Sequence, residues 1–305
     1  MNVKASSTKK LVFLINPGAG TRTAVRIRRL APELFDPTFA LEFVELKDWR
    51  AIRPRAHAAA KAGAWAVVAV GGDGTLNQVA QALQGTRCRL GIVPAGTGNG
   101  YARALGIPLD PRGACAVIAK GLTADVDFAV ADQGRGFANV LGIGYDAWLA
   151  QRANALRWMN RFSGFLRYVV AALQCLPRLR AQSLRLRLDG RKTLDGRFLL
   201  VAVANSPQYG FGCTIAPEAR VDDGLLDIVC VEPCDILTFM RNCVRLFTRK
   251  PLIGAQFYRA RRIRIESLEG TDLAIHTDGE PGGTTPVTVS IRRGTLRSLV
   301  PSSRP

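Results

Sequence analysis

The segment WAVVAVGGDGTLNQ, residues 65–78, decides the fold of this chain. It begins with an apolar run from Trp65 to Val70 that predicts a buried strand, and its end from Leu76 on predicts a helix. Between the two, glycines around the carboxylate of Asp73 allow the backbone to approach a phosphate closely, and the carboxylate is available to a cation. The segment therefore predicts a nucleotide site.

About the first 130 residues alternate apolar runs with helix-like stretches. The predicted strands are Leu11–Ile15, Thr38–Leu46, Trp65–Val70 and Leu90–Val93. The predicted helices are Arg22–Phe35, Pro54–Ala62 and Leu76–Leu83. This alternation predicts an α/β domain with a parallel sheet covered on both faces, in which ligands bind at the carboxyl ends of the strands.

Three of these strands are followed by a turn that contains glycine. The turns read NPGAG at residues 16–20, GGDGT at 71–75 and PAGTGNG at 94–100. One such turn is ordinary, because tight connections after strands often need positive φ. Three of them at one edge of a sheet are a much stronger indication of a phosphate site.

The pattern changes after Phe128, where short apolar runs predict an antiparallel, β-sandwich-like second domain. These runs are Ser183–Leu188, Phe198–Ala204, Leu225–Val231, Arg261–Ile265 and Val287–Ile291. The predicted turns between them include Asp189-Gly190, Asp195-Gly196 and Asp223-Gly224. We expect domains at residues 8–132 and 133–305 with a cleft between them, and the last strand is a candidate to return to the first domain.

Length and composition favour a globular protein in the cytoplasm. The chain has 305 residues, of which 48% are hydrophobic, and no stretch approaches the roughly 20 apolar residues of a membrane-spanning helix. The apolar run Leu11–Ile15 is too short for the core of a secretory signal. Seven cysteines without a CxxC pair, in a chain with two histidines, favour reduced, mostly buried thiols over disulfides or zinc.

The net charge of +18 is concentrated in two segments that together carry 17 of these charges. Residues 152–192 hold ten Lys and Arg against one acid, and residues 241–264 hold eight against none. Such clusters bind nucleic acid or an anionic membrane surface, or simply form a solvated basic face.

One of the basic segments also carries apolar residues at helical spacing. These residues are Trp158, Phe162, Phe165, Leu166, Val169, Val170 and Leu173, with arginines on the remaining surface. The segment is either a helix packed on the sandwich or an interfacial helix that places its apolar face in lipid. For the interfacial case, we expect Arg157, Arg161 and Arg167 to meet the lipid head groups.

The chain resembles the catalytic family of diacylglycerol kinases. The resemblance rests on five separated motifs: Asn16-Pro17 with the following glycines, GGDGT at 71–75, PAGTGN at 94–99, DGLLD at 223–227 and DGEP at 278–281. It extends from Leu11 to about Pro301. It implies a first domain that is similar to NAD kinases, and an ATP-dependent transfer of phosphate to a lipid hydroxyl with Mg²⁺ at the interdomain cleft.

The resemblance also implies roles for single residues. Asp73 would hold the catalytic Mg²⁺, and Glu280 would accept the proton of the lipid hydroxyl. On the residues alone, the Glu280 segment is equally a plain turn between Leu273–Thr277 and Val287–Ile291. The residues implied in nucleotide binding are Asn16, Gly72, Asp73, Gly74, Thr75, Leu76, Asn77, Gln78 and Thr97.

Further metal ligands follow from the same resemblance. Asp127 matches an acidic position of the magnesium network, although a carboxylate that ends a strand is equally an edge device. A structural Mg²⁺ would bind the main-chain carbonyls of Arg220 and Leu225 and the carboxylate of Asp223. The alternative for that segment is an Asp-Gly hairpin turn.

The chain departs from the family pattern at two positions. Gly100 stands where bacterial relatives commonly carry aspartate, and Leu46 stands where some relatives offer a threonine to the nucleotide. Because Gly100 leaves more room beside the γ-phosphate, we expect an acceptor range that extends from diacylglycerol to sphingoid alcohols.

Three functions compete at this point. An ATP-dependent lipid kinase at an anionic membrane surface is favoured, a kinase similar to NAD kinase is the runner-up, and a non-catalytic module that binds anionic lipid or nucleic acid is the third. A serine-histidine hydrolase is disfavoured, because neither histidine lies near a Gly-x-Ser-x-Gly motif. Nucleic acid is the less favoured partner, and a homodimer remains open.

Overall fold

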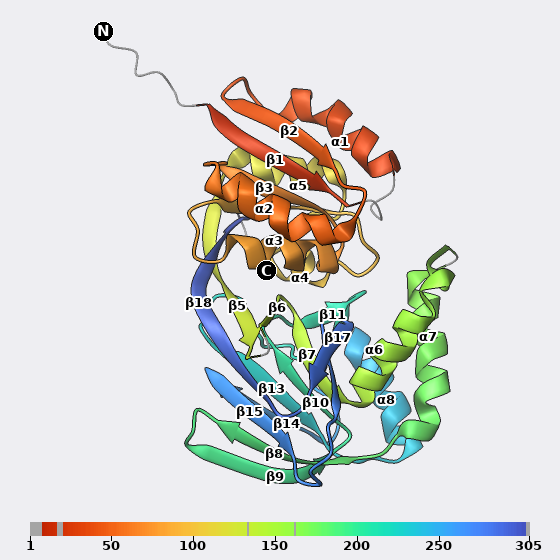
Figure 1. Ribbon diagram of the computed structural model, residues 1–305. Helices are drawn as coiled ribbons and strands as arrows, with labels where there is room; N and C mark the ends of the chain where they lie inside the picture. Colours follow the sequence, from red (N-terminus) through yellow and green to blue (C-terminus); the bar gives the residue numbers. More distant parts are fainter. Residues whose placement is uncertain (1–7, 17–20, 133, 162, 303–305) are drawn as a thin grey trace. The chain divides into compact units, whose positions relative to one another are not determined.

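The structure, a computed structural model, describes residues 8–16, 21–132, 134–161 and 163–302. These residues form two compact units (Figure 1). The described residues up to Val126, together with those from Gly294 on, form the first unit, and Asp127–Arg293 form the second. Two strands, β5 (Thr123–Ala131) and β18 (Val287–Leu299), contribute residues to both units.

The first unit is built on a parallel sheet in the order β2-β1-β3-β4. Its strands are β1 (Lys9–Ile15), β2 (Phe39–Glu45), β3 (Ala66–Gly71) and β4 (Arg89–Pro94). The end of β18 adds a further parallel strand beside β4, where Ser298 lies opposite Leu90. Parallel pairing brings the carboxyl ends of β1, β3 and β4 to one edge of the sheet.

Helices connect these strands, and a short 3₁₀ turn, η2 (Trp49–Ala51), precedes the second of them. The helices are α1 (Thr21–Leu34), α2 (Ile52–Lys61), α3 (Asp73–Leu83), α4 (Gly100–Ala104) and α5 (Pro111–Lys120). Helix α1 packs with α5 and α2 packs with α3, while every residue of β3 is buried. A strand buried throughout is covered on both faces, which confirms the predicted α/β architecture.

The second unit is an antiparallel β-sandwich-like domain. One sheet has the order β14-β13-β10-β7-β16-β17, and antiparallel pairs also join β18, β15, β8 and β9. Besides β5 and β18, the strands are β6 (Arg135–Phe137), β7 (Val140–Gly144), β8 (Gln182–Leu188), β9 (Lys192–Phe198), β10 (Leu200–Ala204), β11 (Gln208–Gly210), β12 (Cys213–Thr214), β13 (Leu226–Val231), β14 (Ala255–Ala260), β15 (Arg262–Ser267), β16 (Ala274–Thr277) and β17 (Glu280–Thr284).

The core of this unit fills the space between the two layers. Val201 of β10 and Ile228 of β13 pack in one buried cluster with Leu186 of β8 and Ile263 of β15. The alternate residues Ala202 and Val229 belong to a second cluster on the other face of the same sheet. Burial on both faces explains why β10 and β13 are apolar throughout, and the predicted sandwich is confirmed.

In the part of the second unit that the structure describes there are three α-helices, with short 3₁₀ turns η3 (Arg157–Arg161) and η4 (Leu176–Arg178) on either side of the second one. They are α6 (Tyr145–Ala155), α7 (Gly164–Cys175) and α8 (Ile236–Phe247). Tyr145, Cys175 and Phe239, one from each helix, share a buried cluster, and the rings of Tyr145 and Phe239 lie 5.2 Å apart. Within the described residues, none of the helices has the length and hydropathy needed to cross a bilayer.

Two local predictions of the sequence are wrong. Asp195-Gly196 is not a turn but lies inside β9, where Asp195 forms an ion pair of 2.6 Å with Arg185 of β8 directly opposite. Residues 158–173 are not one helix, because the Ser163 side chain accepts a hydrogen bond from the Leu166 amide (3.2 Å) and begins α7 as a separate element.

All seven cysteines are free thiols, and four of them are buried. Burial raises the pKa of Cys115 to about 12 and that of Cys230 to about 12. Thiols of this kind are structural, because the reactive thiolate form is scarce.

Candidate functional site

The glycine-bearing turns leave from neighbouring strands at one edge of the first unit. The Asn16 amide donates to the Val70 carbonyl (3.1 Å), and the Ala95 amide donates to the Gly71 carbonyl (2.8 Å). The ends of β1, β3 and β4 are thereby joined side by side. Residues 17–20 of the first turn lie outside the described residues, so the edge is defined here by Asn16 and the other two turns.

The second and third turns touch through their backbones. A Cβ atom on Gly96 would overlap the Cα atom of Gly72, and one on Gly72 would lie 3.1 Å from the Cα atom of Gly96. Asn99, in the left-handed region at φ 51°, holds the third turn: its side chain accepts from the Gly96 amide (3.1 Å) and donates to the Gly96 carbonyl (2.9 Å). Glycine is required at 96 because a Cβ does not fit this contact, and at 72 a Cβ would fit only if the facing backbone moved slightly.

Helix α3 begins at this contact. Its N-cap, Gly72, offers no side chain to the first turn, and Gly74 is exposed with open space where a Cβ would lie. The Asn16 side chain donates to the Thr75 hydroxyl (2.6 Å), which links the first turn to the helix. The start of α3 is therefore bare backbone, the surface that an anion such as phosphate needs.

The other predicted nucleotide residues differ in position. Leu76 is buried and its amide donates to the Gly72 carbonyl (3.1 Å), so its side chain belongs to the core rather than to a ligand surface. Asn77 accepts from the Gln81 side chain (3.2 Å) along the helix, and Gln78 is half-buried. Thr97 is exposed at the tip of the third turn.

The Asp73 carboxylate joins the second turn to the third. Its two oxygens accept hydrogen bonds from the amides of Gly100 (3.1 Å) and Tyr101 (3.2 Å), the first two residues of α4. An ionised carboxylate has about four lone-pair sites. Two backbone amides thus fix the orientation of a group that is also a ligand for cations.

The donor set at Asp73 fits magnesium. Within the described ranges, no group of three or more His, Cys, Asp or Glu side chains converges on one point. Mg²⁺ does not need such a group, because it keeps several waters and is usually bound by one or two carboxylates together with substrate phosphates. One oriented carboxylate beside a bare helix start meets that requirement.

Asp127 belongs to the second unit and is buried, with 1% of its surface exposed. Its carboxylate accepts from the Gly224 amide (2.6 Å), and its own amide donates to the Val221 carbonyl (2.7 Å). The edge-device interpretation of Asp127 is therefore wrong. The structure brings this residue to the loop at 220–225, where the second metal is predicted.

That loop is not a hairpin turn, because the strand that follows it, β13, pairs with β10 and β14. The Asp223 carboxylate accepts from the Leu225 amide (3.0 Å), while Arg220 pairs with Asp222 at 3.2 Å. Carboxylate and carbonyl oxygens are the ligands that Mg²⁺ prefers, so the chemistry of the predicted donor set fits the ion.

Glu280 follows a tight turn in the second unit. Asp278 and Gly279 both have positive φ, 50° and 81°, and connect β16 to β17, whose first residue is Glu280. The Asp278 carboxylate accepts from the amides of Ala138 (2.8 Å), Asn139 (2.9 Å) and Val140 (3.0 Å). The turn is thus anchored by three charge-assisted hydrogen bonds to residues 138–140, which lead into β7.

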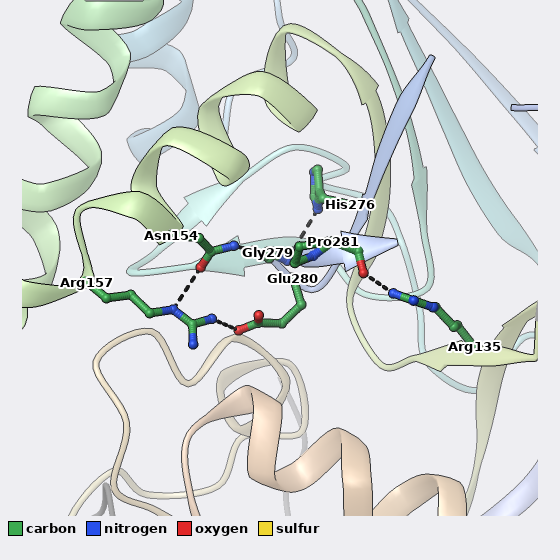
Figure 2. Close-up of polar contacts among 7 residues, drawn as sticks. All are labelled: Arg135, Asn154, Arg157, His276, Gly279, Glu280 and Pro281. Carbon is green, nitrogen blue, oxygen red and sulfur yellow. Dashed lines mark hydrogen bonds and ion pairs between the residues drawn. The ribbon is translucent and has the colours of Figure 1, made fainter. Parts of the chain in front are cut away.

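Side chains around this turn orient Glu280 (Figure 2). Arg157 forms an ion pair with the Glu280 carboxylate and donates to the Asn154 side chain at 3.0 Å. Asn154 in turn donates to the Gly279 carbonyl (2.7 Å), and Arg135 donates to the Pro281 carbonyl. Sequence reasoning missed Asn154 and assigned Arg157 to the membrane, because no local signal links either residue to a turn about 125 positions away.

Comparison with known proteins identifies the family to which the two units belong. The model of the diacylglycerol kinase catalytic domain matches residues 10–131, and that of the YegS C-terminal NAD kinase beta sandwich-like domain matches residues 139–300. A diacylglycerol kinase of Mycobacterium tuberculosis (strain ATCC 25618 / H37Rv) is 33% identical over 251 residues, which cover 80% of this chain and 79% of the relative. A Pseudomonas aeruginosa (strain UCBPP-PA14) protein named "Probable lipid kinase YegS-like" is 32% identical over 249 residues, with 80% and 79% covered.

Solved structures show the same fold. A crystal structure of a diacylglycerol kinase from Bacillus anthracis str. Sterne has a TM-score of 0.71 at 22% identity, and 98% of this chain and 99% of that chain are covered. Another structure from that organism has a TM-score of 0.80 at 24% identity, with 99% and 98% covered.

The two family models and the named relatives identify the chain as a lipid kinase. The chain belongs to the diacylglycerol kinase family. The resemblance and the fold class that the sequence predicts are thereby confirmed.

Proposed function

We propose that the protein transfers the γ-phosphate of ATP, with Mg²⁺, to the hydroxyl group of a membrane lipid. The observation that carries the proposal is the contact between the two glycine turns, with the Asp73 carboxylate held beside the start of α3. Phosphoryl transfer asks the protein mainly for positioning and for electrostatic stabilisation, and this edge provides both.

In the first unit, the bare start of α3 around Gly72 and Gly74 binds the phosphates. Asn16 and Thr75, joined by their 2.6 Å hydrogen bond, add polar groups next to it. Mg²⁺, when bound, neutralises charge on the phosphates. Asp73 holds this ion directly or through water, in the orientation that the Gly100 and Tyr101 amides set.

In the second unit, Glu280 accepts the proton of the lipid hydroxyl. Its side chain is 54% exposed, so an acceptor can reach it, and Arg157 orients the carboxylate. A general base must lie within hydrogen-bond distance of the proton that it removes. The anchored turn at Asp278 and Gly279 helps to keep the Glu280 carboxylate at that distance. Asp127, Asp223 and the carbonyls of Arg220 and Leu225 serve a structural Mg²⁺, with Asp127 acting through the Gly224 amide.

The membrane surface is the place where the enzyme meets its acceptor, and we infer that α7 and α8 face it. On α7, Phe165, Leu166 and Leu173 are exposed by 46–59%, and the Phe165 ring lies 5.9 Å from that of Phe247 on α8. The exposed apolar residues of α8 are Ile236, Leu237, Met240, Val244 and Phe247. Arg241 and Arg245 lie on α8 and Arg249 and Lys250 follow it in the chain, a combination that suits an anionic bilayer.

The arginines expected at the membrane need correction. Arg167 is only 8% exposed and lies over the Tyr168 ring, at 4.7 Å, so it is unavailable to head groups. Arg157 is engaged with Glu280. The Arg161 side chain lies outside the described part of the chain. Apolar side chains of α7 and α8 replace these arginines as the proposed contact.

The test is transfer from γ-labelled ATP to a panel of acceptors with and without Mg²⁺. We expect product with lipid alcohols, diacylglycerol and sphingoid bases included, and none with NAD or with water-soluble alcohols. Transfer of the label from ATP to NAD would indicate the NAD kinase reaction instead. ATP·Mg²⁺ at about 100 times its Kd should also stabilise the fold by roughly 2.7 kcal/mol, whereas a non-catalytic module shows no shift.

A further inference from the structure

A chain of three polar side chains lies beneath the turn that carries Glu280. The hydroxyl of Tyr209 in β11 donates to Asp146 Oδ2 (2.8 Å), and the same oxygen lies 3.3 Å from Nε2 of His276 in β16. On the other side of the ring, His276 Nδ1 accepts from the Gly279 amide (3.3 Å). Asp146 and His276 are buried, with 6% and 4% of their surfaces exposed.

Space for this chain is made by a glycine. A Cβ atom on Gly142 of β7 would overlap both the Asp146 carboxylate and the His276 ring. The other Asp146 oxygen, Oδ1, is buried and has no hydrogen-bond partner in the described structure. All the stabilisation that neighbouring side chains give to this buried carboxylate therefore passes through Oδ2, from Tyr209 and His276.

The direction of each hydrogen bond follows from the Gly279 amide, which can only donate. His276 Nδ1 must then carry a lone pair, and the ring proton of the neutral imidazole lies on Nε2, where it points at Asp146. Burial and the Asp146 carboxylate raise the pKa of Tyr209 well above its usual value, so the tyrosine keeps its proton and also donates. The chain is thus polarised in one direction, from Gly279 through His276 toward Asp146.

We propose that His276, held as the Nε2–H tautomer by Asp146 and Tyr209, is a positioning residue that fixes the Gly279 amide and thereby the place of the Glu280 carboxylate. Asn154 holds the carbonyl of the same residue, Gly279, at 2.7 Å. Both backbone polar groups of Gly279, the residue before Glu280, are therefore held by hydrogen bonds (Figure 2). The inference rests on the proposed role of Glu280 as proton acceptor.

Two amide variants separate the two bonds of His276. In His276→Asn, the shorter side chain places an oxygen near the position of Nδ1 and keeps an acceptor for Gly279. In His276→Gln, the longer side chain places its amide near Nε2, which keeps a donor for Asp146 and loses the bond to Gly279. Each variant gives up one hydrogen bond, but the bond to the buried Asp146 carboxylate is charge-assisted, so we expect His276→Asn to cost more stability than His276→Gln.

We expect kcat to fall at least about tenfold in His276→Gln and to stay within about threefold in His276→Asn, since small misplacements of a reacting group are costly. KM for ATP should not change in either variant. A purely structural role predicts instead that kcat follows the loss of Tm in both variants. Equal kcat in two folded variants would overturn the proposal.

Combination with Glu280→Gln shows whether His276 acts through Glu280. We expect His276→Gln to cause no further loss of the residual rate in the Glu280→Gln background, because the carboxylate that it positions is gone. A full tenfold loss there would contradict the proposal. If Glu280→Gln alone is fully active, the proposed function fails, and that result is distinct from any outcome of the His276 variants.

The tautomer of His276 can be determined by NMR, independently of any activity assay. The chain has two histidines, and the other one, His57 in α2, is exposed. Protein labelled with ¹⁵N-histidine should give one buried imidazole in the neutral Nε2–H form, assigned by its persistence in His57→Gln. Tyr209→Phe should leave that form in place, because His276 still meets Asp146. A buried ring with its proton on Nδ1 would overturn the arrangement.

Discussion

Asp73 and Glu280 are both acidic residues at tight turns, yet the protein holds them in different ways. The Asp73 carboxylate itself accepts two backbone amides, from Gly100 and Tyr101, so its oxygens have fixed positions. For Glu280 the backbone is fixed, through His276 and Asn154, while the carboxylate is exposed and meets only the side chain of Arg157 among the contacts described. Backbone amides hold the Asp73 carboxylate in one orientation, and we call it the rigid site. The Glu280 carboxylate is held by a side chain that can itself move, and we call it the orientable site.

This difference matches the two tasks. A carboxylate that holds a metal must keep one geometry, because Mg²⁺ demands a near-ideal octahedral arrangement. A carboxylate that takes a proton must approach an acceptor that differs from one lipid to another. The predictions below test whether the rigid site and the orientable site fail in different ways.

The largest effect should come from Asp73→Asn. Removal of the charge should lower kcat by at least about 100-fold, as for other single electrostatic contributors. One amide of α4 also loses its acceptor, so we expect the free energy of unfolding to fall by about 1–3 kcal/mol. The matched control is Asp110→Asn, which alters the same kind of cap at α5, where Asp110 accepts from the Gly113 amide at 2.9 Å. Near-parental activity in folded Asp73→Asn would remove its metal role.

Glu280→Gln should lower kcat about as strongly, because the amide cannot take the proton. In contrast to Asp73→Asn, the unfolding free energy should change by less than about 0.5 kcal/mol, as is usual for exposed side chains. Glu218→Gln, at a side chain with 87% exposure, serves as the control for loss of one surface acid. A Glu280→Gln enzyme with full kcat would show that another group accepts the proton.

A pair of glycine variants tests the rigid site through its backbone. Gly96→Ala should unfold the edge and abolish ATP binding, because the new methyl overlaps the Gly72 backbone. Gly74→Ala has room and lies in a helix, so it should stabilise the fold by roughly 0.5–1 kcal/mol and still raise KM for ATP, since the methyl covers the phosphate surface. Thermal unfolding and ATP titration of both variants give the answer. Unchanged KM in Gly74→Ala would place the phosphates elsewhere.

The smallest effect should appear at the membrane. Leu237→Asn with Val244→Asn, at side chains 59% and 65% exposed on α8, should reduce sedimentation with vesicles of phosphatidylcholine and phosphatidylglycerol by roughly tenfold, because apolar area no longer enters the bilayer. Val25→Asn, 63% exposed on α1, is the control in the first unit. Binding that survives in the α8 variant but disappears at high salt would assign the contact to charge alone.

The sequence could predict that the glycine turns lie at one edge of the sheet, because the signals for this are local. Each glycine turn directly follows an apolar run, and parallel pairing then brings the turns to one edge without further information. The hydrogen-bond partners of Asp73 could not be predicted from the sequence. Gly100 and Tyr101 contribute only backbone amides, which no side-chain pattern reveals. The expectation at Gly100 concerned a missing side chain, whereas the structure shows that its amide is used.

The orientable site was predicted only by resemblance to a family. Glu280, Arg157 and Asn154 come from different elements, and His276 reaches Asp146 across 130 positions of sequence. Such contacts depend on how the second unit folds. The same reason accounts for Arg167, which spacing placed on the surface of α7 and which packing buries.

The most direct test of the two-carboxylate account is calorimetric titration of ATP·Mg²⁺ into the wild type, Asp73→Asn and Glu280→Gln. If Asp73 holds the metal and Glu280 takes the proton, ATP·Mg²⁺ affinity should drop by at least about tenfold, or 1.4 kcal/mol, in Asp73→Asn and stay at the wild-type value in Glu280→Gln. Equal loss of affinity in both variants, or loss in Glu280→Gln alone, would contradict the division of roles.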